Sequence, residues 1–176
     1  SEFRYRNPII DSNTMCIFVS QSGETADTIA ALKLAKSRGA TTLTITNVIG
    51  SSITRESDYS IYTHAGPEIA VASTKAYTSQ VAFLASLGVY FAEVLGSSSE
   101  ETLHEIKKDL LDIPGKIETI LKNTDSIEHI ADKIYDQTNM FFIGRGTDYN
   151  VALEGSLKLK EISYIHSEAY AAGELK

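Results

Sequence analysis

The sequence has few of the features that mark several large classes of protein. It contains one cysteine, Cys16, in 176 residues, so no disulfide can form within the chain. Lysine and arginine number 16 against 23 aspartates and glutamates, and the net charge of −7 argues against broad binding to nucleic acid or to an anionic membrane. We find no secretory segment, no run of 18 apolar residues and no low-complexity segment. These absences predict a soluble, cytoplasmic protein.

The common nucleotide-binding motifs are absent as well, but one loop is suited to a smaller phosphate. Residues 14–25 read TMCIFVSQSGET, in which an apolar strand from Met15 to Val19 leads into a loop rich in serine and then into a helix. The loop has neither a Walker lysine nor G-x-G-x-x-G, which argues against a nucleoside triphosphate or a dinucleotide. Backbone N–H groups at the start of a helix favour a small phosphate monoester instead.

Three hydroxyls in this loop are candidate donors to phosphate oxygens, those of Ser20, Ser22 and Thr25, and Gly23 permits a tight or left-handed turn. An alternative stays open at this point. Ser22 or Thr25 could simply cap the helix, because serine, glycine and threonine are ordinary connectors between a strand and a helix. Since the chain is acidic overall, a sugar phosphate has to be captured by local donors against the overall field.

The order of predicted elements indicates an α/β fold with a parallel sheet flanked by helices. Strands alternate with helices, and such an order implies right-handed crossovers that place the functional loops at the carboxyl ends of the strands. The first part of the chain is predicted to contain strands at 15–19, 41–46 and 59–63, and helices at 25–38 and 51–56.

Longer helices are predicted in the middle of the chain. A helix from Ser73 or Thr74 to about Leu95 is apolar over most of its surface, so we expect it to be buried. Helices at 100–121 and 126–135, interrupted near Pro114 and at 123–125, resemble a connector. A new strand at 140–143 and a helix at about 149–165 then repeat the strand–loop–helix pattern.

The last predicted helix carries a narrow strip of charge. Glu154, Lys158 and Glu161 are spaced by four and three residues, so they project from one face. A solvated ladder of ion pairs is the common explanation of such spacing. Apolar residues spread around most of the remaining helix surface, however, which favours a strip that lies in a cleft.

Four stretches of the sequence resemble the glutamine:fructose-6-phosphate aminotransferase (glucosamine-6-phosphate synthase) family, whose isomerase part is built from two sugar-isomerase (SIS) domains. They read SQSGETADT, GSSITRESD, EIAVASTKAYTSQ and LEGSLKLKEISYIHSEAYAAGELK. The resemblance implies a three-layer SIS fold, with the later part of a first SIS domain at 1–97, a helical connector at 98–130 and the start of a second SIS domain at 131–176. It also implies a homodimer, and a glutaminase domain elsewhere in the parent chain.

The resemblance assigns roles to individual residues. Glu161 matches the base that moves a proton between C1 and C2 of the open-chain sugar, and Lys158 matches a residue that stabilises the developing negative charge. The residues that match contacts to the phosphate and the sugar are Ser20, Gln21, Ser22, Thr25, Val71 and Ser73. The implied ligands are fructose 6-phosphate and glucosamine 6-phosphate, without a cofactor.

Two of the family's catalytic groups have no counterpart here. The Schiff-base lysine and the ring-opening histidine of the family fall beyond GELK, so we expect this chain to be inactive on its own. His166 is not that histidine and is expected to be structural. His64, His104 and His129 are scattered at no ligand spacing, and no metal site is indicated.

Two other functions remain alternatives. A non-catalytic SIS module that senses a sugar phosphate would keep SQSGET but would not need Lys158 and Glu161. A related sugar-phosphate deglycase or isomerase would keep the carboxylate without handling ammonia. The long match at the end of the chain disfavours both.

Overall fold

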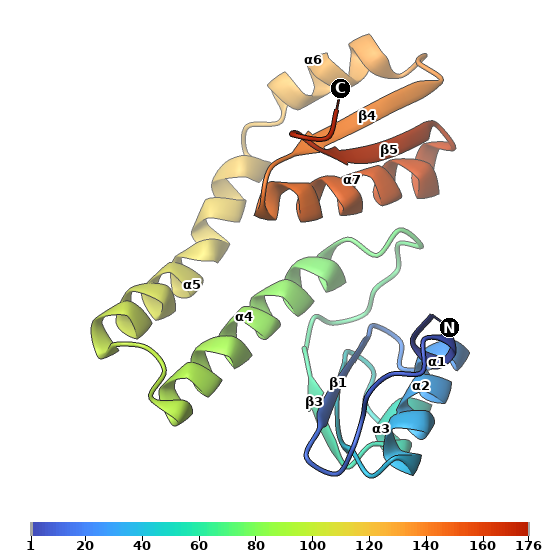
Figure 1. The fold of residues 1–176 in the computed structure, drawn as a ribbon. Helices are drawn as coiled ribbons and strands as arrows, with labels where there is room; N and C mark the ends of the chain where they lie inside the picture. Colours follow the sequence, from blue (N-terminus) through green and yellow to red (C-terminus); the bar gives the residue numbers. More distant parts are fainter. Residues whose placement is uncertain (1, 176) are drawn as a thin grey trace. The chain divides into compact units, whose positions relative to one another are not determined.

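A computed structural model of the chain describes residues 2–175 (Figure 1). The chain divides into two compact units, and each is described by itself. The first unit contains the residues up to Ile69 together with Ser73–Lys107, and the second contains Ala70–Ala72 and the residues from Lys108 onward. The predicted boundaries of the two SIS domains and the connector stay a prediction.

The first unit is built on three parallel strands, as the sequence predicts. They are β1 (Met15–Ser20), β2 (Thr41–Thr46) and β3 (Tyr59–Tyr62), in the order β1-β2-β3. Ser20 pairs with Thr46 in the register, so the last residues of β1 and β2 lie side by side. The predicted α/β class with a parallel sheet is therefore confirmed.

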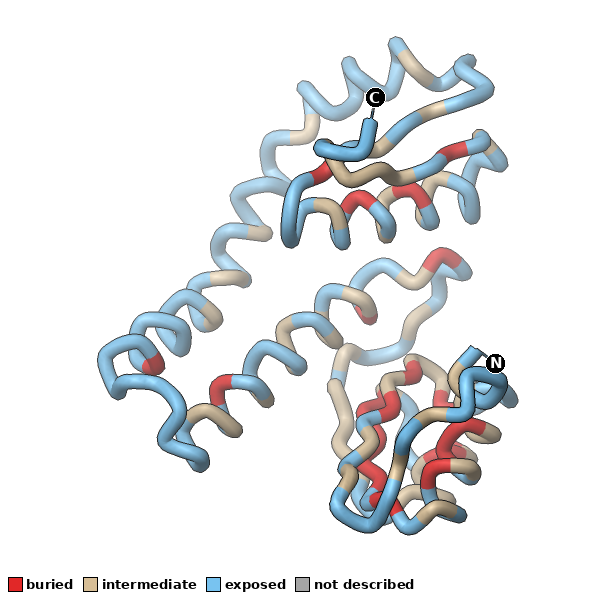
Figure 2. The backbone as a smooth tube through the Cα atoms, in the orientation of Figure 1, coloured by how far each residue is buried: buried red, intermediate tan, exposed pale blue. Residues whose placement is uncertain are grey.

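Two helices connect these strands and form the core with them. They are α2 (Ala26–Ser37) and α3 (Ser52–Glu56). Leu32, Ala35 and Ile53 are almost completely buried and belong to one cluster with Phe18 of β1. Figure 2 shows buried residues gathered in this part of the molecule. Such burial of aliphatic side chains is the main source of stability in a small domain.

The N-terminal segment and the cysteine lie against this core. Helix α1 (Glu2–Tyr5) places the ring of Phe3 edge-on to Phe18, at 6.5 Å between centroids. Cys16 is half-buried and packs against the same cluster, and burial raises the pKa of its thiol.

Helix α4 (Lys75–Leu95) differs from the sequence-based expectation. It has the predicted length, but only Ala76 and Val89 are buried, whereas its other large apolar side chains include several exposed ones. Apolar composition shows that a helix is suited to an apolar environment, but its side chains are buried only where other residues pack against them. Among residues 2–175 few side chains pack against α4. By length and composition alone, α4 is also the one helix of the described residues that could cross a membrane, a test that core helices of soluble proteins also pass.

The second unit contains a parallel pair of strands covered by a helix. The strands are β4 (Asn139–Gly144) and β5 (His166–Ala171), and α7 (Thr147–Ser163) connects them and packs against both. Ser156 of α7 and Ser167 of β5 are buried, and their hydroxyls lie 3.0 Å apart. This hydrogen bond between two buried hydroxyls joins the helix to β5.

Two further predictions about this part need correction. Helix α5 (Glu100–Leu121) is continuous through Pro114, although an interruption was expected there. Pro114 lies on the exposed surface, where water can satisfy the carbonyl that a proline leaves without an N–H partner. Strand β5 is absent from the sequence-based prediction, since its residues continue a motif identified by resemblance and not by strand periodicity. The break before α6 (Asp125–Ile134) is confirmed.

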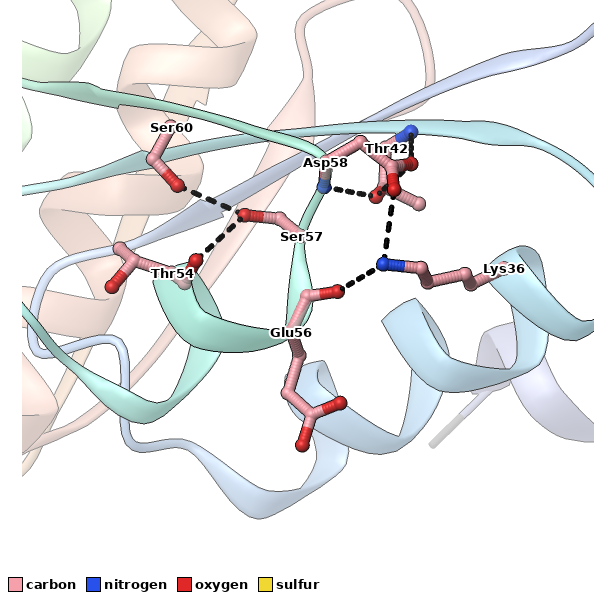
Figure 3. Close-up of polar contacts among 7 residues, drawn as sticks. All are labelled: Lys36, Thr42, Thr54, Glu56, Ser57, Asp58 and Ser60. Carbon is pink, nitrogen blue, oxygen red and sulfur yellow. Dashed lines mark hydrogen bonds and ion pairs between the residues drawn. The ribbon is translucent and has the colours of Figure 1, made fainter.

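In the first unit, the carboxylate of Asp58 joins α2 to the start of β2, at the amino end of the strand (Figure 3). Asp58 accepts from the N–H and the hydroxyl of Thr42, at 2.9 and 2.8 Å, and pairs with Lys36 at 2.9 Å. Lys36 also donates to the carbonyl of Glu56 at 2.8 Å. The pKa of Asp58 is lowered from 3.8 to about 2, first by the hydrogen bond from Lys36 and then by those from Thr42.

This arrangement predicts a pH-dependent contribution to stability. Because the pKa of Asp58 is lower in the folded protein, its contribution is complete above pH 3.8 and is lost as the pH falls towards about 2. We expect Asp58→Asn to lower the thermal midpoint near pH 6, and the difference from the wild type to shrink below pH 3.8 and to vanish once the pH is below about 2. Circular dichroism melts across this range measure it, with Asp112→Asn on the exposed surface of α5 as control. A difference that stays constant with pH would contradict the assignment.

Candidate functional site

The predicted phosphate loop connects β1 to α2 at the carboxyl end of the sheet. Ser20 is buried, and its hydroxyl accepts from the N–H of Gly23 at 3.0 Å. The hydroxyl of Ser22 accepts from the N–H of Glu24 at 3.2 Å. Each of these hydroxyls thus uses a lone pair within the loop and keeps its own hydrogen, which is the atom that a phosphate oxygen accepts.

Helix α2 begins immediately after this loop, and as in any α-helix the N–H groups of its first turn have no carbonyl partner within the helix. Thr25 occupies the N-cap position with an extended backbone, but neither it nor another side chain makes a capping hydrogen bond. Capping by Ser22 or Thr25, the alternative that the sequence left open, is therefore not seen. The N–H groups at the start of α2 supply the partial positive charge that attracts an anion, and Thr25, which immediately precedes them in the chain, is exposed.

Gly23 cannot be replaced without moving the loop. Its φ is +68°, a region that side chains other than glycine rarely adopt. A Cβ atom at this position would lie 2.2 Å from the hydroxyl oxygen of Ser51, which is buried. The loop therefore rests directly against the segment that follows β2.

That following segment holds the loop through its backbone. The N–H of Asn47 donates to the carbonyl of Gln21 at 3.1 Å, and the N–H of Ile53 donates to the carbonyl of Gly23 at 3.0 Å. The carboxylate of Glu24 accepts from the N–H of Ser52 at 2.8 Å. The pKa of Glu24 is lowered, chiefly by its hydrogen bonds with Ser52, so this carboxylate stays charged while it is held by Ser52.

In the second unit, the charged strip on α7 forms the pairs that its spacing predicts. The ammonium of Lys158 lies 2.6 Å from the carboxylate of Glu161 and 3.4 Å from that of Glu154. It also donates to the carbonyl of Ala72. Lysine donates through three hydrogens, and these three acceptors match that number.

This cluster differs from a solvated ladder in its exposure. The side chains of Lys158 and Glu154 are 25% and 24% exposed, and that of Glu161 is 36% exposed. The ordinary surface pair between Lys122 and Glu118 on α5 is 75% and 74% exposed. Partial removal from water strengthens the attraction between charges, so the strip is better suited to electrostatic work than a surface pair.

The environment of Lys158 defines what it can do. Its pKa is raised, above all by the hydrogen bond to Glu161 and in smaller part by Glu154, against an opposing effect of burial. A lysine held as a cation is a poor nucleophile but a good partner for developing negative charge. The same hydrogen bond holds one carboxylate oxygen of Glu161 beside the ammonium of Lys158.

The predicted site residues thus fall into two groups. Ser20, Gln21, Ser22 and Thr25 lie in one loop of the first unit. Lys158 and Glu161 are paired in the second unit, where Ala72 joins them. Val71, which is 99% exposed, and Ser73, which has a φ of +52°, flank Ala72 in the chain.

His166 lies at the start of β5, where its side chain is largely exposed and 3.6 Å from the carboxylate of Glu168. Among residues 2–175, no group of three histidine, cysteine, aspartate or glutamate side chains is arranged to hold a metal ion.

Sequence analysis did not identify the supporting residues Asn47, Ser51 and Ser52. A signal was present, because NVIGSS follows a strand that is parallel to β1, and the carboxyl ends of parallel neighbours meet at one edge. The sequence does not indicate, however, which backbone groups of the loop after β1 and of the segment after β2 form hydrogen bonds with each other.

The Lys158–Glu161 pair makes a direct prediction. We expect Glu161→Gln to lower the pKa of Lys158, because the strongest contact that holds its proton loses its charge. Side-chain NMR of the lysine ammonium groups measures this pKa. Glu118→Gln, which alters the exposed pair on α5, serves as control and should leave the pKa of Lys158 unchanged. An unchanged pKa in Glu161→Gln would show that the pair does not form in solution.

Comparisons with known proteins identify a family for the chain. The SIS domain model matches residues 1–90 and 133–176. The chain is 60% identical over all 176 residues to "Glutamine--fructose-6-phosphate aminotransferase [isomerizing]" of Clostridium tetani, and 50% identical to the protein of the same name from Thermococcus kodakarensis. In each case it spans 29% of the relative's length.

A solved structure shows the same fold. The C-terminal domain of glucosamine-fructose-6-phosphate aminotransferase from Francisella tularensis superimposes with a TM-score of 0.94 at 41% identity, over 99% of this chain and 49% of that one. Because the family model matches most of the chain and the fold agrees, the chain belongs to the SIS domain family.

Proposed function

We propose that the chain is the sugar-phosphate-binding part of a glutamine:fructose-6-phosphate aminotransferase, and that it supports ketose–aldose isomerisation with amination at C2. One observation carries the proposal: a partly covered Lys158–Glu161 pair on a chain that is 60% identical, over its full length, to a protein with that name. A module that only senses a sugar phosphate has no need of this pair.

The phosphate of the substrate is assigned to the loop of the first unit. The hydroxyls of Ser20, Ser22 and Thr25 and the N–H groups at the start of α2 supply the hydrogen-bond donors, and Gln21 contributes an amide for the sugar. The N-cap residue Thr25 makes no side-chain capping hydrogen bond, which supports this role because its hydroxyl is not engaged at the helix start. Because the chain is acidic overall, these local donors have to attract the anion against the net charge of −7.

The proton transfer is assigned to Glu161. Interconversion of a ketose and an aldose through an enediol needs one base that takes a proton from one carbon and returns it to its neighbour. The negative charge that develops on the oxygen in this step needs a nearby cation, and Lys158 is kept charged by its two carboxylate partners. Val71 and Ser73, which flank Ala72, are proposed to contact the sugar.

The remaining parts of the proposal rest on the family resemblance. They are the ligands fructose 6-phosphate and glucosamine 6-phosphate, a homodimer, a cytoplasmic location, and a glutaminase domain in the same parent chain that supplies ammonia.

Phosphate binding is tested by calorimetric titration with glucosamine 6-phosphate, and with unphosphorylated glucosamine as the ligand control. We expect saturable binding of the phosphorylated sugar only. Ser22→Ala removes one hydrogen bond to a charged group and should weaken binding roughly tenfold to a hundredfold. Ser98→Ala, in the exposed loop after α4, should have no effect. Equal affinity for the two sugars would contradict the assignment of the phosphate to this loop.

A further inference from the structure

Asn47 follows β2 and makes hydrogen bonds in two directions. Its backbone N–H donates to the carbonyl of Gln21 in the phosphate loop, at 3.1 Å. Its side chain turns to the segment that follows β3, where Oδ1 accepts from the N–H of Ala65 at 2.9 Å and from the hydroxyl of Thr63 at 3.2 Å. Its Nδ2 donates to the carbonyl of Gly66 at 2.7 Å. One residue therefore joins the carboxyl ends of all three strands of the first sheet.

The chemistry of these contacts matches an amide. One end of the side chain accepts two hydrogen bonds and the other end donates one, a combination that asparagine supplies at this length. Aspartate lacks the donor, and serine is too short to span the three partners.

The segments that Asn47 joins need such support, because their backbones are not regular. His64 and Gly66 have φ values of +52° and +72°, and the first is unusual for a residue with a side chain. In the phosphate loop, Gly23 has a φ of +68°. Conformations of this kind persist only where surrounding contacts hold them.

A second contact shows that the end of β2 and the phosphate loop are fixed together. The hydroxyl of Thr46 donates to the same carbonyl of Gln21, at 3.2 Å. A shift of Asn47 would therefore move Gln21, because the backbone N–H of Asn47 is hydrogen-bonded to the Gln21 carbonyl, and it would also move the neighbours of Gln21 in the loop. The side chain of Asn47 opposes such a shift through its hydrogen bonds to residues 63–66.

We propose that Asn47 is a positioning residue for sugar-phosphate binding. By anchoring its own backbone to residues 63–66, it holds the carbonyl of Gln21, and hence the Gln21–Gly23 backbone, in the conformation that receives the phosphate. This inference rests on the proposed function of the loop. Asn47 itself does not have to contact the ligand.

The test compares three variants of the full chain: Asn47→Ala, Thr63→Val and, as a matched control, Asn13→Ala in the exposed segment before β1. Calorimetry with glucosamine 6-phosphate gives the Kd, and amide hydrogen exchange by NMR gives the protection of the Gly23 N–H, which donates to Ser20. Asn47→Ala should weaken binding about tenfold and speed exchange at Gly23. Thr63→Val, which removes one contact of Asn47 with little change of shape, should have a smaller effect in the same direction.

A variant that combines Asn47→Ala with Thr63→Val separates positioning through Asn47 from a general loss of stability. If Thr63 acts through Asn47, the double variant binds no more weakly than Asn47→Ala alone, whereas independent effects would multiply. Wild-type affinity and wild-type exchange at Gly23 in Asn47→Ala would overturn the inference, whatever happens to the thermal midpoint. If the unmodified chain binds no sugar phosphate, the proposed function fails, and exchange at Gly23 alone decides whether Asn47 positions the loop.

Discussion

The parallel, in-register pairing of β1 with β2 is the constraint on which the predicted phosphate loop depends. Because Ser20 pairs with Thr46, the chain leaves both strands at the same edge, and the segments that follow are forced together. The loop after β1 then meets the segment after β2, and Gly23 lies against Ser51. Loop conformation here is a consequence of strand register, not of the loop sequence alone.

In the second unit the candidate residues are held by contacts between charges, whereas in the first unit the loop is held by backbone hydrogen bonds. Lys158 is surrounded by two carboxylates and one carbonyl on a helix that is anchored to β5 through Ser156 and Ser167. A cation with three acceptors has little freedom to reorient, so Glu161 is held as well. This preorganisation distinguishes the strip from the exposed ion pairs on α5, whose side chains remain solvated.

The sequence predicted the elements well and their surroundings less well. Strand Thr41–Thr46 matches its prediction residue for residue, and β1 and α2 differ by one or two residues, because alternation and helix-ending signals are local. The burial of α4 was wrongly predicted, since apolar composition does not specify neighbours. Pro114 did not break its helix, and β5 was missed. The spacing of Glu154, Lys158 and Glu161 predicted their contacts, whereas the bonds of Asn47 depend on loops from three strands and have no local signature.

The Ser20–Thr25 loop is the proposed site of phosphate binding. The most direct measurement is a two-dimensional amide NMR titration of the chain with glucosamine 6-phosphate. We expect saturable shifts concentrated on the N–H groups of Gln21–Thr25 and the first turn of α2. Saturable binding whose shifts lie elsewhere, with those amides unchanged, would contradict it.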